Sequence, residues 1–466
     1  MIAVATRPER TVTRPAPIKG MNTADMVTAL DKGFAQRIDN LICRPDGLQV
    51  RPGFRPVDDA GAAVTSLLFY GNNPVARTDG AWRGAMLANP GGQFLFASRS
   101  GITPKVYNGS TWSDCSISGV NYWSLVAPVE HGKRIYCIES GTLNIWYLPL
   151  ESYGGEAKPI YAGAMSKLGG YGVALGSDGQ RLYISTSNGE LLVYSGLNPA
   201  TPETWTFAGR FKVPRPVGER CFATSATGGL MYAADTGLYS IPSLLKAAEA
   251  DQEYMALTAP IEPTYRASGA SGVIVSASND FAAVQTADGL LVKTGNGWSR
   301  LLGFNATQWV ETADGLYFSR SDGTIYKVDG TEDFTAYDEA PAPIGCLLID
   351  SFSRFGASGG KKFTRIRPHF TLTHPYKAKA SMLMNYRKPP SSWEAQYDAS
   401  SYWTWPEVSY SMMPAEWTKA RSERLGLWRG TAGNGEVGAL MLGISSLNAG
   451  ATFIGCDYAF EAGGSF

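Results

Sequence analysis

The sequence predicts an all-β protein, with a β-propeller of six or seven blades followed by a C-terminal antiparallel β domain. Three observations lead to this prediction. Glycine accounts for 53 of the 466 residues, well above the usual roughly 7%, which favours many tight turns. Short apolar or aromatic runs alternate with turns rich in Gly, Asn, Asp and Ser. Pairs of such runs return at a spacing that is typical of propeller blades.

Hairpin signatures recur between residues 62 and 340. Each has β-branched or aromatic runs on both sides of an SG, NG, TG or DG turn, where glycine adopts a positive φ without a steric clash. Successive hairpins start at 94, 134, 181, 230, 281 and 316, so they lie 40, 47, 49, 51 and 35 residues apart. An earlier unit at 66–82 raises the blade number from six to seven. A long sandwich or barrel also alternates strands with turns, but it does not require a hairpin at this spacing. Residues 61–340 are therefore predicted to form a propeller.

Residues 1–60 are predicted to form an arm and a clasp segment. The first 20 residues are rich in arginine and proline, which is typical of an extended arm. Residues 21–41 are expected to hold one short helix, capped by Asn22 or Thr23 and ended by Gly33. Residues 36–57 combine arginines, prolines and glycines with isolated apolar residues, and such a segment cannot bury a core by itself.

Residues 341–466 are predicted to form the antiparallel domain. Residues 361–388 alternate between apolar and polar side chains, which predicts a hairpin with its turn at 374–376 and with one buried and one solvated face. The apolar face of its first strand comprises Ile366, Pro368, Phe370 and Leu372; the polar face comprises Arg365, Arg367, His369, Thr371 and Thr373. In the last strand, the side chains of Ile454, Cys456, Tyr458 and Phe460 are expected to share one face.

The charge balance argues against a protein that grips nucleic acid or anionic lipid. Lys plus Arg equals Asp plus Glu, at 41 each, whereas a protein that binds duplex DNA tightly usually carries a basic excess. The six scattered cysteines form no CxxC motif and predict free, buried thiols in a protein made in a reducing compartment. The N-terminus lacks the apolar segment of a signal peptide, and no run of 18 apolar residues predicts a membrane span.

No motif predicts catalysis. HExxH, GxSxG and Cys/His clusters with zinc spacing are absent. The GASGGKK stretch (356–362) lacks the first glycine of a phosphate loop and has Lys362 where Ser or Thr would bind magnesium. The SRSDGTIY turn (319–326) is similar to the Asp-box of sialidase-like propellers but lacks its tryptophan. The sequence therefore predicts no enzyme activity, no catalytic residues, no cofactor and no metal site.

Two surfaces are predicted to make contacts. Aromatic residues concentrate in 391–417, and Trp and Tyr dominate interface anchors, although packing within the chain and sugar binding are alternatives. The expected anchors are Trp393, Trp403, Trp405 and Trp417. A basic strand with Lys361, Lys362, Arg365 and Arg367 is a weaker candidate for phosphate contact, because a solvated strand face explains it equally well.

Segments at both ends of the chain resemble the tail nozzle, or hub, proteins of short-tailed bacteriophages. At the N-terminal end the resemblance lies in the Pro17–Gly20 stretch, in Asp39-Asn40, and in a GL-x-x-R-x-G segment formed by Gly47, Leu48, Arg51 and Gly53. At the C-terminal end it lies in KKFTRIRPHF (361–370), LWRGTAGNGEVGAL (427–440) and EAGGSF (461–466). Between them only the repeated hairpins are similar.

The resemblance implies a virion protein that assembles in the host cytoplasm into a homo-oligomeric ring, expected to be a hexamer. The ring would lie below the head-to-tail adaptor protein, attach tail fibres or spikes, and pass genomic DNA through its lumen without sequence specificity. It implies no catalytic residues. The alternative prediction is a receptor-binding propeller that binds or cleaves a glycan, for which acidic and aromatic side chains should meet on the propeller axis.

A ring requires an interface that closes by rotation. The clasp segment, with Arg37, Arg44, Arg51 and Arg55, is predicted to join the propeller to the C-terminal domain or to the next subunit. The simpler alternative is an ordinary edge strand and turn within its own subunit.

Overall fold

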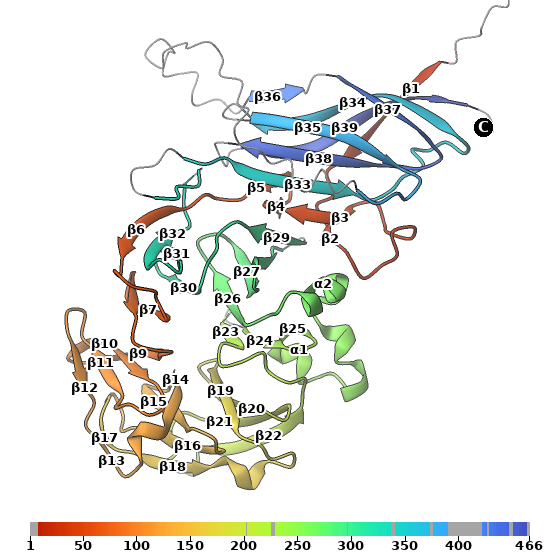
Figure 1. The fold of residues 1–466 in the computed structure, drawn as a ribbon. Helices are drawn as coiled ribbons and strands as arrows, with labels where there is room; N and C mark the ends of the chain where they lie inside the picture. The colour runs from red at the N-terminus through yellow and green to blue at the C-terminus, as the bar shows by residue number, and fades with distance from the viewer. Residues whose placement is uncertain are drawn as a thin grey trace, which may run out of the picture. The chain divides into compact units, whose positions relative to one another are not determined.

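The computed structural model confirms an all-β protein (Figure 1). It describes residues 8–201, 203–224, 229–295, 297–330, 332–336, 341–372, 376–389, 422–425, 428–446 and 451–463. Helical elements among these residues are short: α1 (Ile241–Leu244), α2 (Glu262–Ala267), and the 3-10 turns η1 (Tyr122–Ser124), η2 (Ala162–Met165), η3 (Glu249–Asp251), η4 (Glu253–Met255) and η5 (Ala259–Ile261).

The chain forms two compact units. One contains Met1–Pro56, Leu291–Gly303 and Val328–Phe466; the other contains Val57–Leu290 and Phe304–Lys327. We call them the terminal unit and the propeller unit. Residues 1–56 thus group with the C-terminal strands by their contacts. The three-part division at residues 60 and 340 stays a prediction.

Five blades of four strands each form the propeller arrangement. Three consist of β9 (Arg83–Asn89), β10 (Gly92–Ser98), β11 (Lys105–Tyr107) and β12 (Trp112–Asp114); of β14 (Leu125–His131), β15 (Arg134–Glu139), β16 (Asn144–Tyr147) and β18 (Lys158–Tyr161); and of β19 (Gly172–Ser177), β20 (Arg181–Thr186), β21 (Glu190–Ser195) and β22 (Thr206–Lys212). The others consist of β26 (Gly272–Ser276), β27 (Phe281–Gln285), β28 (Gly289–Lys293) and β29 (Trp298–Leu302), and of β30 (Gln308–Thr312), β31 (Gly315–Ser319), β32 (Thr324–Lys327) and β6 (Arg55–Asp59).

The number of blades is five, so the prediction of six or seven was wrong. Two smaller sheets explain the difference: the pair β7 (Ser66–Tyr70) and β8 (Asn73–Arg77), and the trio β23 (Phe222–Thr224), β24 (Leu230–Ala234) and β25 (Gly237–Ser240). Each contains a hairpin that resembles the hairpin of a full blade. Counting hairpins therefore overestimates the number of four-stranded blades. A further short pair, β13 (Ile117–Ser118) and β17 (Gly155–Glu156), is parallel.

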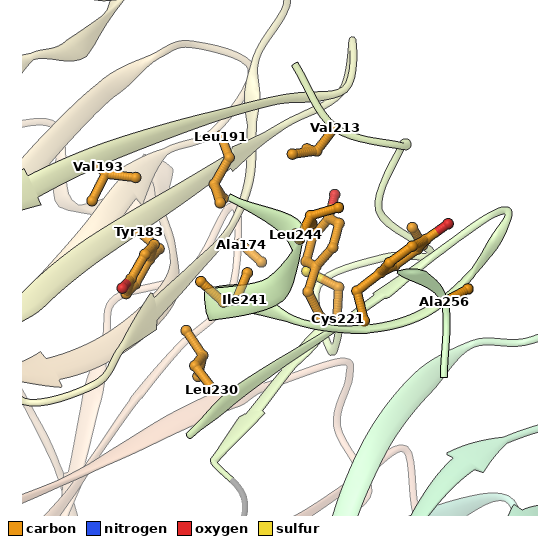
Figure 2. Packing of buried hydrophobic residues seen from close by; sticks show 13 residues of the cluster. Ala174, Tyr183, Leu191, Val193, Val213, Cys221, Leu230, Ile241, Leu244 and Ala256 are labelled. Carbon is orange, nitrogen blue, oxygen red and sulfur yellow. The ribbon is translucent and has the colours of Figure 1, made fainter. Parts of the chain in front are cut away.

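Apolar clusters between neighbouring sheets hold the propeller unit together. In one cluster, α1 places Ile241 and Leu244 against Tyr183, Leu191 and Cys221 (Figure 2). All five side chains are 2% exposed or less. Burial of aliphatic side chains of this size contributes about 1.5–3 kcal/mol each, so α1 stabilises the junction between β19–β22 and β23–β25.

The terminal unit contains long strands in two sheets. One has the order β36 (Ser422–Leu425), β34 (Lys361–Leu372), β39 (Thr452–Ala462), β5 (Gly47–Val50), β4 (Leu41–Arg44), with β1 (Glu9–Pro15) also on β39 and β37 (Arg429–Gly435) also on β34. The other continues from β29 in the order β29, β3 (Phe34–Asp39), β33 (Ile344–Asp350), β38 (Gly438–Ser446), β35 (Tyr376–Met384), with β2 (Gly20–Met21) also on β3.

Two local predictions in this unit were wrong. Residues 361–388 do not form a hairpin, because β34 and β35 belong to different sheets. In β39 the alternate residues Cys456, Tyr458 and Phe460 are buried, and so are Asp457 and Ala459 between them, so side chains on both faces of this strand are buried. The helix expected within 21–41 is absent: Asn22 Oδ1 instead accepts bonds from the amides of Ala24 and Asp25, each at 3.1 Å, and forms a turn.

Candidate functional site

Close backbone contacts fix both glycines of the GL-x-x-R-x-G segment. Leu48 is buried opposite Phe453 of β39. Gly47 has a φ of 155°, and a Cβ on it would lie 2.4 Å from the carbonyl oxygen of Phe453. A Cβ on Gly53 would lie 1.9 Å from the carbonyl oxygen of Glu332. Glycine is required at both positions because no other residue allows the neighbouring backbone to come so close.

Arg51 connects this segment to two others in the terminal unit. Its side chain is 1% exposed, and its Nη1 and Nη2 donate to the two carboxylate oxygens of Asp333 at 2.9 and 2.7 Å. Nε donates to Asn40 Oδ1 at 3.1 Å. A bidentate pair of this kind is both strong and directional. The arginine of the motif therefore fixes the position of three chain segments.

Like Arg51, the Asp39-Asn40 pair connects separate chain segments of the terminal unit. Asn40 adopts a φ of 56°, and its Oδ1 also accepts the amide of Leu302 at 2.7 Å. Asp39 accepts from Arg300 Nε at 2.7 Å and from Arg37 Nε at 2.7 Å. The short polar side chain of Asn tolerates the left-handed conformation and satisfies buried backbone groups in the same place.

The remaining arginines of the predicted clasp differ in exposure. Arg37 is half-buried in its ion pair with Asp39. Arg55 lies on the surface and binds Asp329 at 2.8 and 3.0 Å. Arg44 is half-buried at the end of β4. These side chains act within one chain, and their proposed role between subunits stays a prediction.

The four residues predicted to contact phosphate have different surroundings. Lys361 is 0% exposed, and its Nζ donates to the carbonyl oxygens of Gly359 and Glu436 at 3.0 and 2.8 Å. Burial lowers the pKa of Lys361, and the charge of Arg354 adds to the effect. Lys362, in contrast, is exposed. Lys361 is thus committed to backbone oxygens, whereas Lys362 faces solvent.

The two arginines of this strand are both near carboxylates and an indole ring. Arg365 forms an ion pair with Glu9, and Arg367 Nη2 lies 2.6 Å from Asp457 Oδ2. Their guanidinium carbons lie 5.2 and 4.7 Å from the ring centre of Trp428, which is within range of a cation–π attraction. Phosphate contact by the basic strand stays a prediction. Trp393, Trp403, Trp405 and Trp417 lie outside the described residues.

The propeller unit contains a cavity of about 530 Å³ between its innermost strands. Strands β7, β9, β14, β19, β23, β26 and β30 all contribute to its wall. The cavity therefore lies where a propeller has its axis. Its volume falls within the roughly 300–1,000 Å³ that is common for small-molecule sites.

Charged side chains gather at this axial cavity. Arg83 Nε lies 2.9 Å from Glu219 Oε2. The next residue, Arg220, is half-buried, and its Nη2 and Nη1 donate to Gln308 Oε1 at 2.8 Å and to the carbonyl oxygen of Trp309 at 3.3 Å. Burial lowers the pKa of Arg220 to about 10; the charge of Arg83 acts in the same direction and Glu219 opposes it.

Two further polar side chains in the cavity wall have unsatisfied atoms. Gln285 is 7% exposed, and its Nε2 is buried without a hydrogen-bond partner. Glu311 Oε1 accepts the amide of Ala277 at 3.1 Å, whereas its Oε2 is buried without a partner. Burial raises the pKa of Glu311, and its hydrogen bonds oppose this. Such groups are rare in folded proteins and indicate either stored strain or a missing partner.

These axial residues were not among the candidates that the sequence motifs indicated. The repeated hairpins correspond to the second and third strands of the blades, such as β10–β11 and β15–β16. Most side chains on the axis come instead from the first strands and the residues just before them, which carry no turn motif, whereas Gln285 is the last residue of the second strand β27. A signal exists only in retrospect: Glu219-Arg220 and Glu311 lie a few residues upstream of hairpins.

Neither metal-ligand groups nor membrane-spanning helices are found among the described residues. No group of three or more His, Cys, Asp or Glu side chains there has the geometry of a metal site. No helix in the described ranges has the length and apolarity needed to cross a bilayer. All six cysteines are buried free thiols.

Comparisons with known proteins give structural likeness only. No family model and no curated protein matches the sequence. The β-propeller domain of Myceliophteria thermophila Cps50 (Swd1) is 13% identical, with 59% of this chain and 99% of that chain covered and a TM-score of 0.40. The WD40 repeats of RRP9 are 10% identical, with 60% and 98% covered and a TM-score of 0.39. The computationally designed Ika8 protein is 11% identical, with 58% and 97% covered and a TM-score of 0.34. Because these scores lie below 0.5, the propeller arrangement rests on the strand order of the chain itself.

Proposed function

We propose that this protein is a structural subunit of a short-tailed phage tail, a nozzle that forms a ring and conducts DNA. One observation carries the proposal. The segments at the two ends of the chain that resemble nozzle proteins meet in one sheet: β5, in the GL-x-x-R-x-G segment, pairs with β39, and β39 pairs with β34, which contains the KKFTRIRPHF stretch. If both segments come from one nozzle-like module, they are expected to lie together in the fold although they are far apart in the sequence.

The motif residues add support because each has a physical task in that module. Gly47 and Gly53 allow close backbone contact, and Arg51 connects Asn40 with Asp333. A short motif supports a common fold more strongly when the structure explains why its residue types are required. In the proposed assembly the adaptor protein, the fibres or spikes and the genomic DNA are partners, and the protein does no chemistry.

Mass and shape in solution test the proposal. Light scattering across a concentration series, with negative-stain images of the same sample, is expected to show annular particles of about six subunits. A monomer at every concentration, both alone and with the adaptor ring of the same tail, would contradict ring formation.

The aromatic segment 391–417 provides a variant test of the same idea. Replacing Trp403 and Trp405 with Ala is expected to reduce the ring fraction at least tenfold while the monomer keeps its circular dichroism spectrum and Tm. The matched control is Trp123→Ala, since Trp123 is a 53% exposed tryptophan of the propeller unit. Loss of the fold in the double variant would show that these tryptophans pack within the chain instead.

A further inference from the structure

The axial cavity contains a guanidinium group that forms no ion pair with a carboxylate of the described residues. The hydrogen-bond acceptors of Arg220 are the neutral oxygens of Gln308 and Trp309, and among the described residues no carboxylate forms an ion pair with it. The adjacent carboxylate, Glu219, is engaged by Arg83. A charge removed from water without a partner is costly, so an anion bound at Arg220 would relieve that cost.

A second donor lies in the wall of the same cavity. Arg220 and Gln285 both flank Gly272: a Cβ on Gly272 would lie 2.8 Å from Arg220 Cβ and 3.6 Å from Gln285 Oε1. The carbonyl oxygen of Arg220 accepts the amide of Val273 at 2.9 Å, which holds the residue against β26. The unsatisfied Nε2 of Gln285 is a donor. A guanidinium and an amide N–H in the wall of one cavity are donors that suit the oxygens of a carboxylate.

The rest of the cavity is too large and too varied for a simple ion. Its wall includes the apolar side chains of Leu68, Phe222 and Val275. It also includes Glu311, whose buried Oε2 has no donor. Hydroxyl groups would supply such a donor, and the C–H faces of a sugar ring suit apolar walls. The ligand that fits is therefore a polyhydroxylated ring, such as a sugar, that carries one anionic group.

The geometry points to a binding site for an acidic saccharide on the propeller axis. Its carboxylate binds Arg220 and Gln285, and a hydroxyl group donates to Glu311. The site is for recognition, and no bond is made or broken in it. It goes beyond the proposed nozzle function and does not depend on ring assembly, so either proposal can fail alone.

Matched sugars test the ligand class. The full-length protein is titrated, by calorimetry and saturation-transfer NMR, with glucuronate, galacturonate and N-acetylneuraminate. Glucose, which has a hydroxymethyl group where glucuronate has its carboxylate, and acetate, which has no sugar body, are the controls. At least one acidic sugar is expected to bind at least tenfold more tightly than glucose and acetate. No binding of any acidic sugar, or equal binding of glucose, overturns the proposal; equal binding of acetate or inorganic phosphate reduces the site to a simple anion site and overturns the saccharide assignment.

Two variants locate the site. Arg220→Gln and Gln285→Leu are each expected to weaken binding at least tenfold, whereas Arg181→Gln, on the exposed part of β20, leaves it unchanged. Gln285→Leu removes an amide whose Nε2 makes no hydrogen bond in the fold, so its Tm is expected to be equal or higher. This variant keeps the test decisive if Arg220→Gln does not fold. Unchanged affinity in Gln285→Leu would overturn the placement of the carboxylate.

Discussion

At the scale of single residues, Arg51 shows why a buried charge can define a sequence motif. A lone guanidinium in a protein interior is strongly destabilising, whereas a bidentate partner and a second acceptor make it specific. Asp333 and Asn40 supply these. The sequence marked Arg51 as important but indicated a surface contact, because an arginine between prolines and glycines gives no sign of burial.

Removing the partner of Arg51 is expected to be severe. Asp333→Ala leaves the guanidinium buried without its counter-ion and should lower the free energy of unfolding by about 3–5 kcal/mol. The matched control is Asp329→Ala, which breaks the exposed pair with Arg55 and should cost at most about 1 kcal/mol. Urea unfolding measures both. Equal losses in the two variants would show that Arg51 does not depend on Asp333.

Asp350 is expected to give stability a pH dependence. Its carboxyl group is buried, and burial raises its pKa to about 6, although the nearby Arg14 opposes this. In the unfolded chain the pKa is about 3.9. The folded protein thus holds this proton more tightly, so the contribution to stability is present below about pH 4 and is lost as the pH rises through about 6.

The test compares the protein with Asp350→Asn, which does not titrate. The unfolding free energy of the protein minus that of the variant should fall between about pH 4 and pH 6 and then stay constant. Urea unfolding at several pH values gives this difference and cancels the titration of other carboxyl groups. A difference that rises with pH would mean that the attraction to Arg14 outweighs burial.

At the scale of elements, the terminal unit shows the limit of alternation as a guide. Alternating residues correctly predicted that Ile366, Pro368 and Phe370 are buried. Alternation cannot say which strand is the neighbour, and β34 and β35 pair in different sheets. For β39 the polar positions face other strands, where Thr13 and Arg367 bond to Asp457 at 2.7 and 2.6 Å. Long-range partners thus leave Asp457, a polar residue of β39, only 5% exposed.

Strand β1 is expected to protect β39. Its residues pair with β39 along their whole length, from Glu9 opposite Glu461 to Pro15 opposite Gly455. Deleting residues 1–15 leaves one edge of β39 unpaired over that length, and an open hydrophobic edge promotes association. A lower Tm and aggregation beyond that of the parent in light scattering are expected. Deleting residues 1–8 keeps β1 and should change neither; identical behaviour of both truncations would show that β1 is dispensable.

At the scale of the whole molecule, the repeated hairpins were sufficient to predict an all-β chain with a propeller. They were insufficient for the blade number and for the axial cavity. The blade number depends on strands that flank the hairpins, and one of these, β6, comes from the opposite end of the chain. The cavity depends on residues such as Arg83 and Glu219, which lie 136 positions apart in the sequence and form an ion pair in its wall.

The closure of the last propeller blade by β6 can be tested at the turn before β32. Gly323 has a φ of 102°, and a Cβ on it would lie 2.6 Å from the carbonyl oxygen of Ala62; its own carbonyl oxygen accepts the amide of Ala60 at 3.1 Å. The segment that follows β6 therefore lies directly against this glycine. Gly323→Ala must push the two backbones apart, whereas Gly179→Ala, at a φ of 85° with nothing within 4 Å, introduces only conformational strain.

In both variants the free energy of unfolding should fall by about 1–2 kcal/mol, because alanine is strained in the left-handed backbone conformation. In Gly323→Ala it should fall by about 1–3 kcal/mol more, because the two backbones must move apart. Urea unfolding gives the difference. Hydrogen exchange should quicken at β32 and at residues 57–60 in Gly323→Ala while β19–β22 keep their protection, because the strain lies where the chain closes the last blade. If the two variants lose the same free energy and exchange alike, the propeller does not depend on the N-terminal strand for closure, and the last blade must be held by its own three strands.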